Sequence, residues 1–546
     1  MIERRFQVAT LAVYVIATAV ILTISWFQCD GHFFYALDDP YIHLSIAENI
    51  ARGHYGINLE EYSSPSSSII YPFLLAPFAW LGIERMVPLL IGVASMAAIL
   101  WLVSGFFARH VIAGGTREHS LGWLLLAPFL VLAINGVALP IAGMEHPLHV
   151  LTVVLTILGL VNLGETGRMP PVLLIGIFLA PLFRFEGLAL SSAAIVVLVL
   201  KGRKRAAIGL TAAIGLSLLS YGVFMHLHGL PLLPSSVMVK STVSAAAADQ
   251  GPLRVVAGIA QNLVGSFKNR WGTLLLVGIV LLLPALGTIR ARHRDGRMAL
   301  DLDTRAMVAL AVIGAVAAHL VLGAYGWFGR YEVYILTALL LAVIYVLSHA
   351  IRRIEPGWLR IATCALALTL LDFSYVKTTW DTPGAARNVY EQQYQLHRFV
   401  TDFFRHPVAV NDIGYVSYRN DGFVLDLYGL GSEEARKLLK SGNRDLDSFA
   451  AMVQRHHVPL AMIYQNWFQG AAPSGWVPIA QLTTDKVTSG DSTVTFYLTD
   501  PSRREELMHA LRRFAPTLPR RVKFVVGTES IPQAPVQSCP IEHVLP

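Results

Sequence analysis

Two adjacent aspartates, Asp38 and Asp39, have the position in this chain that most favours acid–base chemistry. They follow an apolar run at residues 33–37 and precede Pro40, a residue type that is frequent in the first turn of a helix. One aspartate, Asp39, is enough to cap that helix, which leaves Asp38 beside an apolar surface. Burial there would raise the pKa of its carboxyl group and let it act as a base. The spacing alone leaves a capping role and a catalytic role for the pair equally open.

Two basic residues are candidates for binding an anion such as phosphate. Lys240 lies in an apolar stretch after the turn-rich residues 228–236, and Arg330 lies between the aromatic residues Phe328 and Tyr331. A fixed cation in such a place can hold a phosphate group. The alternatives are a surface lysine and an arginine that anchors a helix at a membrane interface.

The composition places these residues in a membrane protein. The 546 residues are 54% hydrophobic and only 14% charged, with a mean hydropathy of +0.53. A soluble protein carries about 25% charged residues, so this composition excludes an ordinary soluble enzyme, and it also excludes a disordered chain. The net charge of +7 fits the basic cytoplasmic loops of a membrane protein, so we expect no nucleic-acid partner.

Apolar segments long enough to cross a bilayer recur along the first 376 residues. They predict a mostly α-helical, polytopic bundle of about eleven transmembrane helices, at residues 8–27, 86–108, 121–141, 146–163, 171–183, 187–200, 206–225, 272–289, 306–324, 332–350 and 360–376. The fifth and sixth are short and are interrupted by Arg184 and Glu186. The apolar segment at 69–82 is also short and contains two prolines, so we interpret it as an interfacial or re-entrant piece.

The basic clusters predict the orientation of this bundle. Residues 201–205, 290–297 and 352–353 all fall on the cytoplasmic side if the N-terminus is cytoplasmic, as the positive-inside rule requires. Two long outer loops then cover residues 28–85 and 226–271, and residues 377–546 follow the last span outside. Alternating strand and helix patterns in that last part predict a C-terminal α/β domain beyond a membrane domain of residues 1–376.

The remaining ionisable residues near the ends of the spans share one side in this layout. A mixed set of acids and bases at an outer face indicates a polar cleft there, although any one of them could simply reach from a span end to water. The members are Asp38, Asp39, Glu145, His146, Arg184, Glu186, His226, His228, Lys240, Arg330, Glu332 and Asp372.

Several segments resemble, in order, the motifs of GT-C glycosyltransferases. Residues 38–44, 47–54 and 61–65 resemble the first outer loop of that superfamily, and look closest to the branch that contains mycobacterial terminal arabinofuranosyltransferases. The weaker matches are Ala-Gly-Met-Glu at 142–145, Arg-Phe-Glu-Gly at 184–187, Leu-Pro-Ser-Ser through Lys240 at 233–240, Gly-Arg-Tyr at 329–331, Asn-Asp-Ile-Gly at 411–414 and Asp-Leu-Tyr-Gly-Leu at 426–430. The chain departs from the family pattern at two places. It has no glycine after Glu61, and it has Phe185 where the family has proline.

The resemblance implies an integral-membrane glycosyltransferase with the GT-C fold. It would move a sugar with inversion from a polyprenyl-phosphate donor to a cell-envelope glycan or glycolipid, and the branch that looks closest suggests arabinofuranose as that sugar. The reaction would take place at the outer face of a bacterial inner membrane, with residues 1–376 as the catalytic domain, the N-terminus cytoplasmic and the C-terminal domain periplasmic. An inverting transfer needs one carboxylate base rather than the pair that most glycosidases use.

The same resemblance assigns the site residues. It implies Asp38 as the base with Asp39 as the runner-up. Lys240 is the first choice as ligand of the donor phosphate, with Arg330 and Arg184 in support. Sugar or acceptor binding would fall to Glu145, Glu186, His43 and Tyr62. Some GT-C enzymes use a divalent cation, so one is possible here, but we assign no metal ligand.

Two other readings remain open. One is a transporter or flippase of a lipid-linked sugar, which should show inverted repeats that this sequence lacks. The other is a different GT-C transferase, of the mannosyl or aminoarabinosyl type. The chain has no nucleotide-binding glycine loop and no zinc-protease motif, so ATP-driven transport and zinc proteolysis are unsupported.

Overall fold

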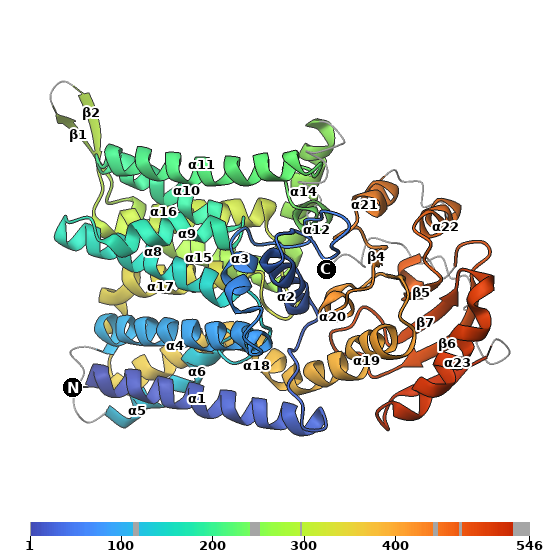
Figure 1. Ribbon diagram of the computed structural model, residues 1–546. Helices are drawn as coiled ribbons and strands as arrows, with labels where there is room; N and C mark the ends of the chain where they lie inside the picture. Colours follow the sequence, from blue (N-terminus) through green and yellow to red (C-terminus); the bar gives the residue numbers. More distant parts are fainter. Residues whose placement is uncertain are drawn as a thin grey trace.

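A helical bundle and an α/β domain lie side by side in the computed structural model (Figure 1). The structure describes residues 2–112, 120–240, 252–294, 297–440, 446–468 and 472–527. All but the last of the long helices lie wholly in the bundle. The final one, α18 (Gly357–Glu391), continues into the second domain.

Within the described part of the chain, eight helical segments are long and apolar enough to cross a membrane. They are α1 (Ile2–Gln28), Glu84–Ile112 with α4 (Val87–Phe107) at its centre, Gly122–Ile141 with α5 (Ser120–Leu124), α6 (Ala127–Ala133) and α7 (Ala138–Ile141), then α8 (His146–Thr166), α11 (Lys204–Leu227), α16 (Thr304–Leu322), α17 (Val333–Arg352) and the segment containing α18. The chain is thus a multi-pass membrane protein.

Three further apolar elements complete the bundle. Helices α14 (Pro252–Lys268) and α15 (Arg270–Leu286) meet at 87° and pass the same test only as a pair. Helices α9 (Pro171–Phe183) and α10 (Gly187–Leu200) are shorter, as their sequence predicted. The apolar segment near residue 75 forms only the short helices α3 (Tyr71–Leu75) and η1 (Ala76–Phe78), so it is not a span.

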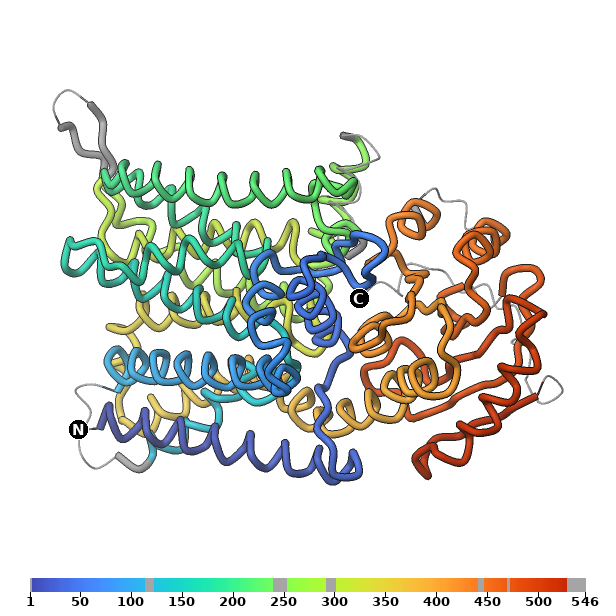
Figure 2. The backbone as a smooth tube through the Cα atoms, viewed as in Figure 1, coloured from blue at the N-terminus to red at the C-terminus, as the bar shows by residue number. Residues whose placement is uncertain are grey.

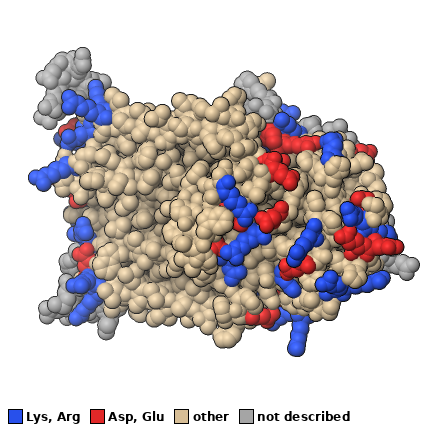
Figure 3. All heavy atoms as spheres, viewed as in Figure 1, with Lys and Arg blue, Asp and Glu red and all other residues tan. Residues whose placement is uncertain are grey.

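Charged residues mark the two ends of the bundle. On the face in Figure 3, Lys and Arg gather at the end remote from the α/β domain, and a broad uncharged band separates them from the charges near that domain. The strands β1 (Arg290–Arg294) and β2 (Arg297–Asp301) form a hairpin at the remote end. This distribution is typical of a bundle whose middle lies in hydrocarbon.

The α/β domain is built on one mixed sheet. Its strand order is β4-β3-β5-β7-β6-β8; β3 runs parallel to β4 and β5, and the other pairs are antiparallel. The strands are β3 (Val408–Val410), β4 (Val424–Asp426), β5 (Leu460–Ile463), β6 (Val477–Thr483), β7 (Thr493–Leu498) and β8 (Lys523–Val526). The helices α19 (Gln393–Arg398), α20 (Gly414–Ser417), α21 (Glu433–Lys440), α22 (Leu446–Arg455) and α23 (Arg504–Phe514) accompany it.

The first outer segment joins the two domains. Its helix α2 (Asp39–Ala51) lies between the bundle and the α/β domain, where Figure 2 shows the blue chain crossing the junction. Ile42 and Ile46 are buried in one apolar cluster with Ile413 and Val416. The apolar stripe of this helix therefore packs against protein and does not face lipid.

Candidate active site at the junction of the two domains

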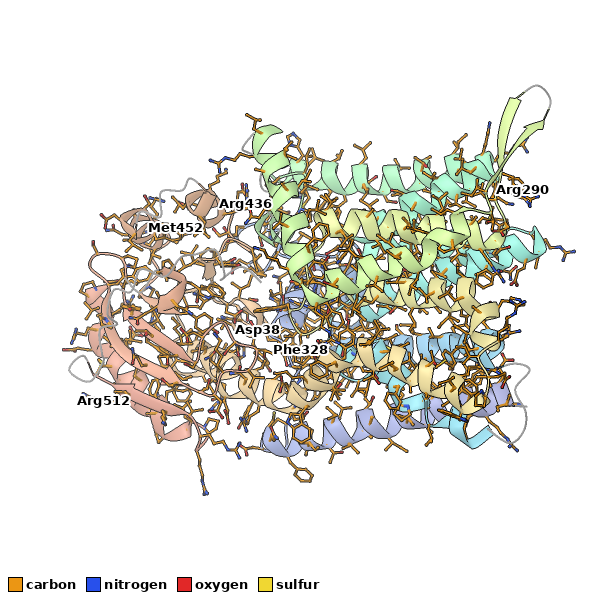
Figure 4. The ribbon with its side chains drawn as sticks, turned by 180° about the vertical axis from the view of Figure 1, so that it is seen from behind. Asp38, Arg290, Phe328, Arg436, Met452 and Arg512 are labelled. Atoms are coloured by element: carbon orange, nitrogen blue, oxygen red, sulfur yellow. The ribbon has the colours of Figure 1, made fainter. Side chains whose placement is uncertain are left out.

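Asp38 occupies the position just before α2, at the boundary between the domains. Its side chain is 9% exposed and makes no capping bond to the helix. Instead its Oδ1 accepts a hydrogen bond of 2.8 Å from the backbone N–H of Tyr415, on α20 of the α/β domain. Because α2 begins at Asp39, the residue at the N-cap position is Asp38 and not Asp39. This corrects the expected assignment. Figure 4 shows Asp38 and Phe328 at this junction.

A second carboxyl group, that of Asp412, approaches Asp38 from the α/β domain. Asp412 accepts hydrogen bonds from Gln393 Nε2 at 3.1 Å and from the Tyr464 hydroxyl at 3.2 Å. Gly414 follows in the same loop, and a Cβ atom there would stand 2.2 Å from both the carbonyl oxygen and Oδ2 of Asp38. Only a glycine lets this loop come so close to the aspartate.

The two carboxyl groups affect each other's ionisation. Burial raises the pKa of Asp38 well above its ordinary range, and the adjacent Asp412 carboxyl raises it further. Burial also raises the pKa of Asp412. Asp38 Oδ2 is buried without a hydrogen-bond donor among the described groups, so a hydrogen bond between the two carboxyl groups requires a proton on one of them. The pair therefore holds a proton more firmly than separate aspartates would.

Asp39 faces the membrane domain and pairs with Arg330. The Nη2 atom of Arg330 donates to both Asp39 carboxylate oxygens, at 3.3 and 3.2 Å. Arg330 is 1% exposed, and its Nε and Nη1 atoms have no partner among the described residues. Trp327 and Phe328, just before it, have positive φ values of 46° and 66°. This strained loop presents two buried, unused N–H donor atoms at the site.

Arg184 is held differently, by two carboxylates. Its Nη1 donates to Glu145 Oε1 at 2.7 Å, while its Nε and Nη2 donate to Glu186 at 3.2 and 2.7 Å. The other Glu145 oxygen lies 3.3 Å from His43 Nε2, and Ser67 donates to Glu145. The structure thus joins four of the predicted site residues in one buried network. In that network Arg184 is already neutralised.

The last two predicted residues lie apart from these pairs. Tyr62 is 38% exposed, and its ring packs between those of His54 and His228. Lys240 is the final residue of the short helix α12 (Ser235–Lys240), but its side chain lies outside the described residues. Asp426, from the second α/β motif, accepts the N–H groups of Tyr428 and Gly431, so it shapes its own loop.

A cavity of about 660 Å³ opens beside the Arg184 network. One end is polar, with Ser67, Arg184, Glu186, Ser236 and Tyr331. The rest is apolar and runs along α10 and α16, where it is lined by Leu188, Ala189, Ala193, Val196, Gly314, Ala318 and Leu322. The ring of Tyr331 lies under both guanidinium groups, 5.7 Å from Arg184 and 5.2 Å from Arg330. A ligand with a polar head and a long apolar chain fits this shape.

His319, buried in the last turn of α16, also lines this cavity. Its Nδ1 lies 2.9 Å from the Tyr334 hydroxyl, which bridges α16 and α17 as expected of a polar residue in a span.

Sequence reasoning did not assign Asp412, Gly414 or Tyr415 to the site. The Asn-Asp-Ile-Gly motif was visible, but nothing in its spacing places it against Asp38, 374 residues earlier. Within the described residues, no three His, Cys, Asp or Glu side chains converge as metal ligands.

Comparison with known proteins supports the fold. Over 90% of its length the chain is similar to the apo oligosaccharyltransferase of Archaeoglobus fulgidus, covering 74% of that protein with a TM-score of 0.50 and 10% identity. The oligosaccharyltransferase AglB of the same organism, in complex with an inhibitory peptide and a dolichol-phosphate, matches with the same coverages, a TM-score of 0.43 and 13% identity. The predicted GT-C-like membrane bundle with a C-terminal α/β domain is confirmed.

Sequence comparison adds one partial match. Residues 387–497 match a family model described as a domain of unknown function, DUF8728, which covers most of the α/β domain. No curated protein matches the chain in sequence.

Proposed function

We propose that this protein is a membrane glycosyltransferase that uses a lipid-linked sugar donor. The observation that carries the proposal is the meeting of a buried carboxyl pair, Asp38 and Asp412, with a cationic loop at Arg330. Next to them lies a cavity with a polar end and an apolar channel. The shared fold with an oligosaccharyltransferase supports the reaction class by analogy.

The cavity along α10 and α16 would hold the donor. A polyprenyl chain fits the apolar channel, and the phosphate would lie at the polar end near Tyr331. Arg330 is the better phosphate ligand among the described arginines, because its Nε and Nη1 have no partner, whereas Arg184 is bound by Glu145 and Glu186. We keep Lys240 as a further candidate for the phosphate, since α12 lies at the same end.

Asp38 would be the base. It takes the proton of the acceptor hydroxyl as that oxygen forms its bond to the anomeric carbon, and the bond from this carbon to the phosphate oxygen breaks with inversion. The leaving group is a polyprenyl phosphate, whose growing charge the N–H groups of Arg330 stabilise. Asp39 would fix Arg330, and Glu145, Glu186, His43 and Tyr62 would contact the sugar or acceptor.

Orientation and compartment follow from the same proposal. The α/β domain would lie outside a bacterial inner membrane, because the basic clusters at residues 201–205, 290–297 and 352–353 then face the cytoplasm. Activated sugars at that face are lipid-linked. The sugar could be arabinofuranose, as the resemblance of the first outer loop implies, and the acceptor a glycan or glycolipid of the cell envelope.

A transfer assay tests this function. Purified protein in nanodiscs is given a panel of polyprenyl-phosphate sugars, and released polyprenyl phosphate is measured with and without cell-envelope acceptors. We expect turnover with one donor. Failure of every lipid-linked donor to react, with or without acceptor, would contradict the proposal.

On the acid side of the pH profile, the rise of kcat should follow the pKa of the Asp38–Asp412 pair. Asp38 must lose its proton to act as a base, so kcat should rise with pH through the raised pKa of the pair. In Asp412→Asn the second negative charge is gone and an amide can donate to Asp38. The acid limb should therefore move to lower pH. Profiles of both proteins measure this; an unmoved limb, or one moved to higher pH, would show that Asp412 does not set the ionisation of Asp38.

Replacing Arg330 should weaken donor binding. Arg330→Gln removes the cation and is expected to raise the KM for the donor about 10- to 100-fold, the loss of about 1.5–3 kcal/mol from a charged hydrogen bond. Arg330→Lys keeps the charge opposite Asp39 and should show a smaller rise. Arg52→Gln, at the exposed end of α2, is the control. Equal donor KM values in all of these variants would remove Arg330 from the phosphate site.

A further inference from the structure

A second cavity, of about 760 Å³, lies on the other side of the loop that carries Arg330. Its walls come from α6, α15, α18 and the loop itself. The loop residues alternate between the two cavities: Phe328 and Gly329 line the second one, Arg330 binds Asp39, Tyr331 lines the first, and Glu332 lines the second. Neighbouring Cα atoms are about 3.8 Å apart, so a few ångströms of backbone separate the two cavities.

Close contacts hold the loop in place beside the second cavity. A Cβ atom on Gly329 would stand 2.6 Å from the ring of Tyr375, and Gly329 has a φ of +66°. The Asn135 side chain donates to the carbonyl oxygens of Phe328 and Gly329, at 3.2 and 3.1 Å. Any ligand in this cavity therefore touches the same short loop that positions Arg330.

Buried acids line the cavity. Glu332 accepts the N–H of Gly326 at 2.7 Å. Asp372, on α18, is 3% exposed, and its Oδ1 has no hydrogen-bond partner among the described residues. Lys377 is the one cation among the lining residues, and it is exposed and paired with Asp381. Arg270, at the edge, donates to Ser374 Oγ and to the carbonyl of Leu370. A buried acid with an unpaired oxygen in such a cavity calls for a ligand that can form a hydrogen bond with it.

The other walls suit a sugar ring on an apolar chain. Trp271, Phe328 and Trp380 provide aromatic faces, and Phe129, Leu132 and Phe373 provide an apolar surface. Phe373 and Trp380 are largely exposed on the flank of α18, so the cavity is open toward the surrounding lipid. Apart from the exposed and paired Lys377, the lining residues offer a phosphate headgroup no cation, whereas sugar hydroxyls can both donate to and accept from the two acids.

We propose that this second cavity binds the acceptor as a lipid-anchored glycan, with an uncharged sugar against Asp372 and Glu332 and its chain along α6 and α18. The inference rests on the proposed function, because it names the class of acceptor that the transferase would use. Donor and acceptor lipids would then enter from two flanks of the bundle and meet at the loop of residues 326–332. The other occupant, a lipid whose phosphate fills the cavity, is an outcome of the test.

Photolabelling tests the site without any turnover. The protein is placed in phosphatidylcholine nanodiscs with a dodecyl glucoside that carries a diazirine in its chain, or with the matching dodecyl phosphate. Labelled peptides are mapped by mass spectrometry. We expect the glucoside to label residues 369–380 and the phosphate to label them about tenfold less, a difference of about 1.4 kcal/mol.

A matched pair of variants makes the result specific. Thr369→Trp fills the cavity, and Thr363→Trp places the same side chain six residues earlier, outside it. Both threonines are exposed on α18 and donate to the carbonyl four residues before. Glucoside labelling should fall about tenfold only in Thr369→Trp. Equal labelling in both variants, or labelling by the phosphate as strong as by the glucoside, would overturn the proposal.

Turnover separates this inference from the function on which it rests. With an active donor, Thr369→Trp should lose transfer to a lipid-anchored acceptor, whereas Thr363→Trp should transfer as the wild type does. If the wild type turns over no donor, the proposed function fails although the labelling stands. If it transfers sugar and Thr369→Trp transfers equally well, the acceptor role of this cavity is wrong.

Discussion

Asp38→Asn should lower kcat for sugar transfer by about 10²- to 10⁴-fold, the usual contribution of a general base. Asparagine has the same shape, and its Oδ1 can still accept the Tyr415 N–H. Its amide can donate to Asp412, as a protonated Asp38 would. The variant should therefore fold and bind the donor normally while lacking a group that can take the acceptor proton. The measurement is single-turnover transfer together with the melting temperature.

Glu60→Gln is the control for this experiment. Glu60 lies in the same outer segment and is exposed, so its replacement should change neither rate nor stability. Full transfer by Asp38→Asn would exclude Asp38 as the base. Loss of activity in Asp39→Asn alone would move that role to Asp39.

Gly414→Ala should lower transfer by about 10²-fold although residue 414 touches no substrate in the proposed mechanism. The new Cβ would stand 2.2 Å from Asp38, so the α/β loop and Asp38 must move apart. A displacement of about 1 Å at a reacting group can cost that factor in rate. The KM for the donor should change little, because the donor cavity lies in the membrane domain. Steady-state kinetics with both substrates measure the two effects.

The matched control is Gly384→Ala. Gly384 lies in α18 near the same domain junction, where a Cβ would meet Val487 at an ordinary 3.6 Å. Alanine favours a helix over glycine by about 1 kcal/mol, so this variant should be as stable as the wild type or more so, and fully active. Equal activity of the two alanine variants would mean that the contact between Gly414 and Asp38 does not position the site.

The membrane bundle was predictable because its signal is local. Each span is a run of apolar residues, and the requirement that a backbone in lipid form its own hydrogen bonds makes such a run helical. The prediction therefore placed a span at each of the eight long segments of the described chain and at the short α9 and α10, but of the bent pair it found only α15 and missed α14. In the α/β domain the alternation of strand and helix patterns was visible in the sequence. The order of the strands in the sheet was not, because it depends on pairings between segments far apart in the chain, such as β3 with β5 and β6 with β8.

The candidate site was only half predictable. Asp38, Arg330, Arg184, Glu145 and Glu186 stood out because a charged residue near a span end is costly and needs a reason. Their pairings did not follow from that argument. Arg184 belongs with Glu145 and Glu186, whereas Arg330 belongs with Asp39, and this division changed which arginine we assign to the phosphate.

By itself, the sequence determined that this is a multi-pass membrane protein with an α/β domain after the last span and a proline-started helix behind an Asp-Asp pair. Hydrophobic length and local turn chemistry are enough for that. Only the tertiary structure brought Asp412 and Gly414 onto Asp38, buried α2 between the domains and opened two cavities on either side of one loop. Such contacts join residues hundreds of positions apart. They form because whole apolar surfaces pack together, and this packing cannot be predicted from a short stretch of sequence.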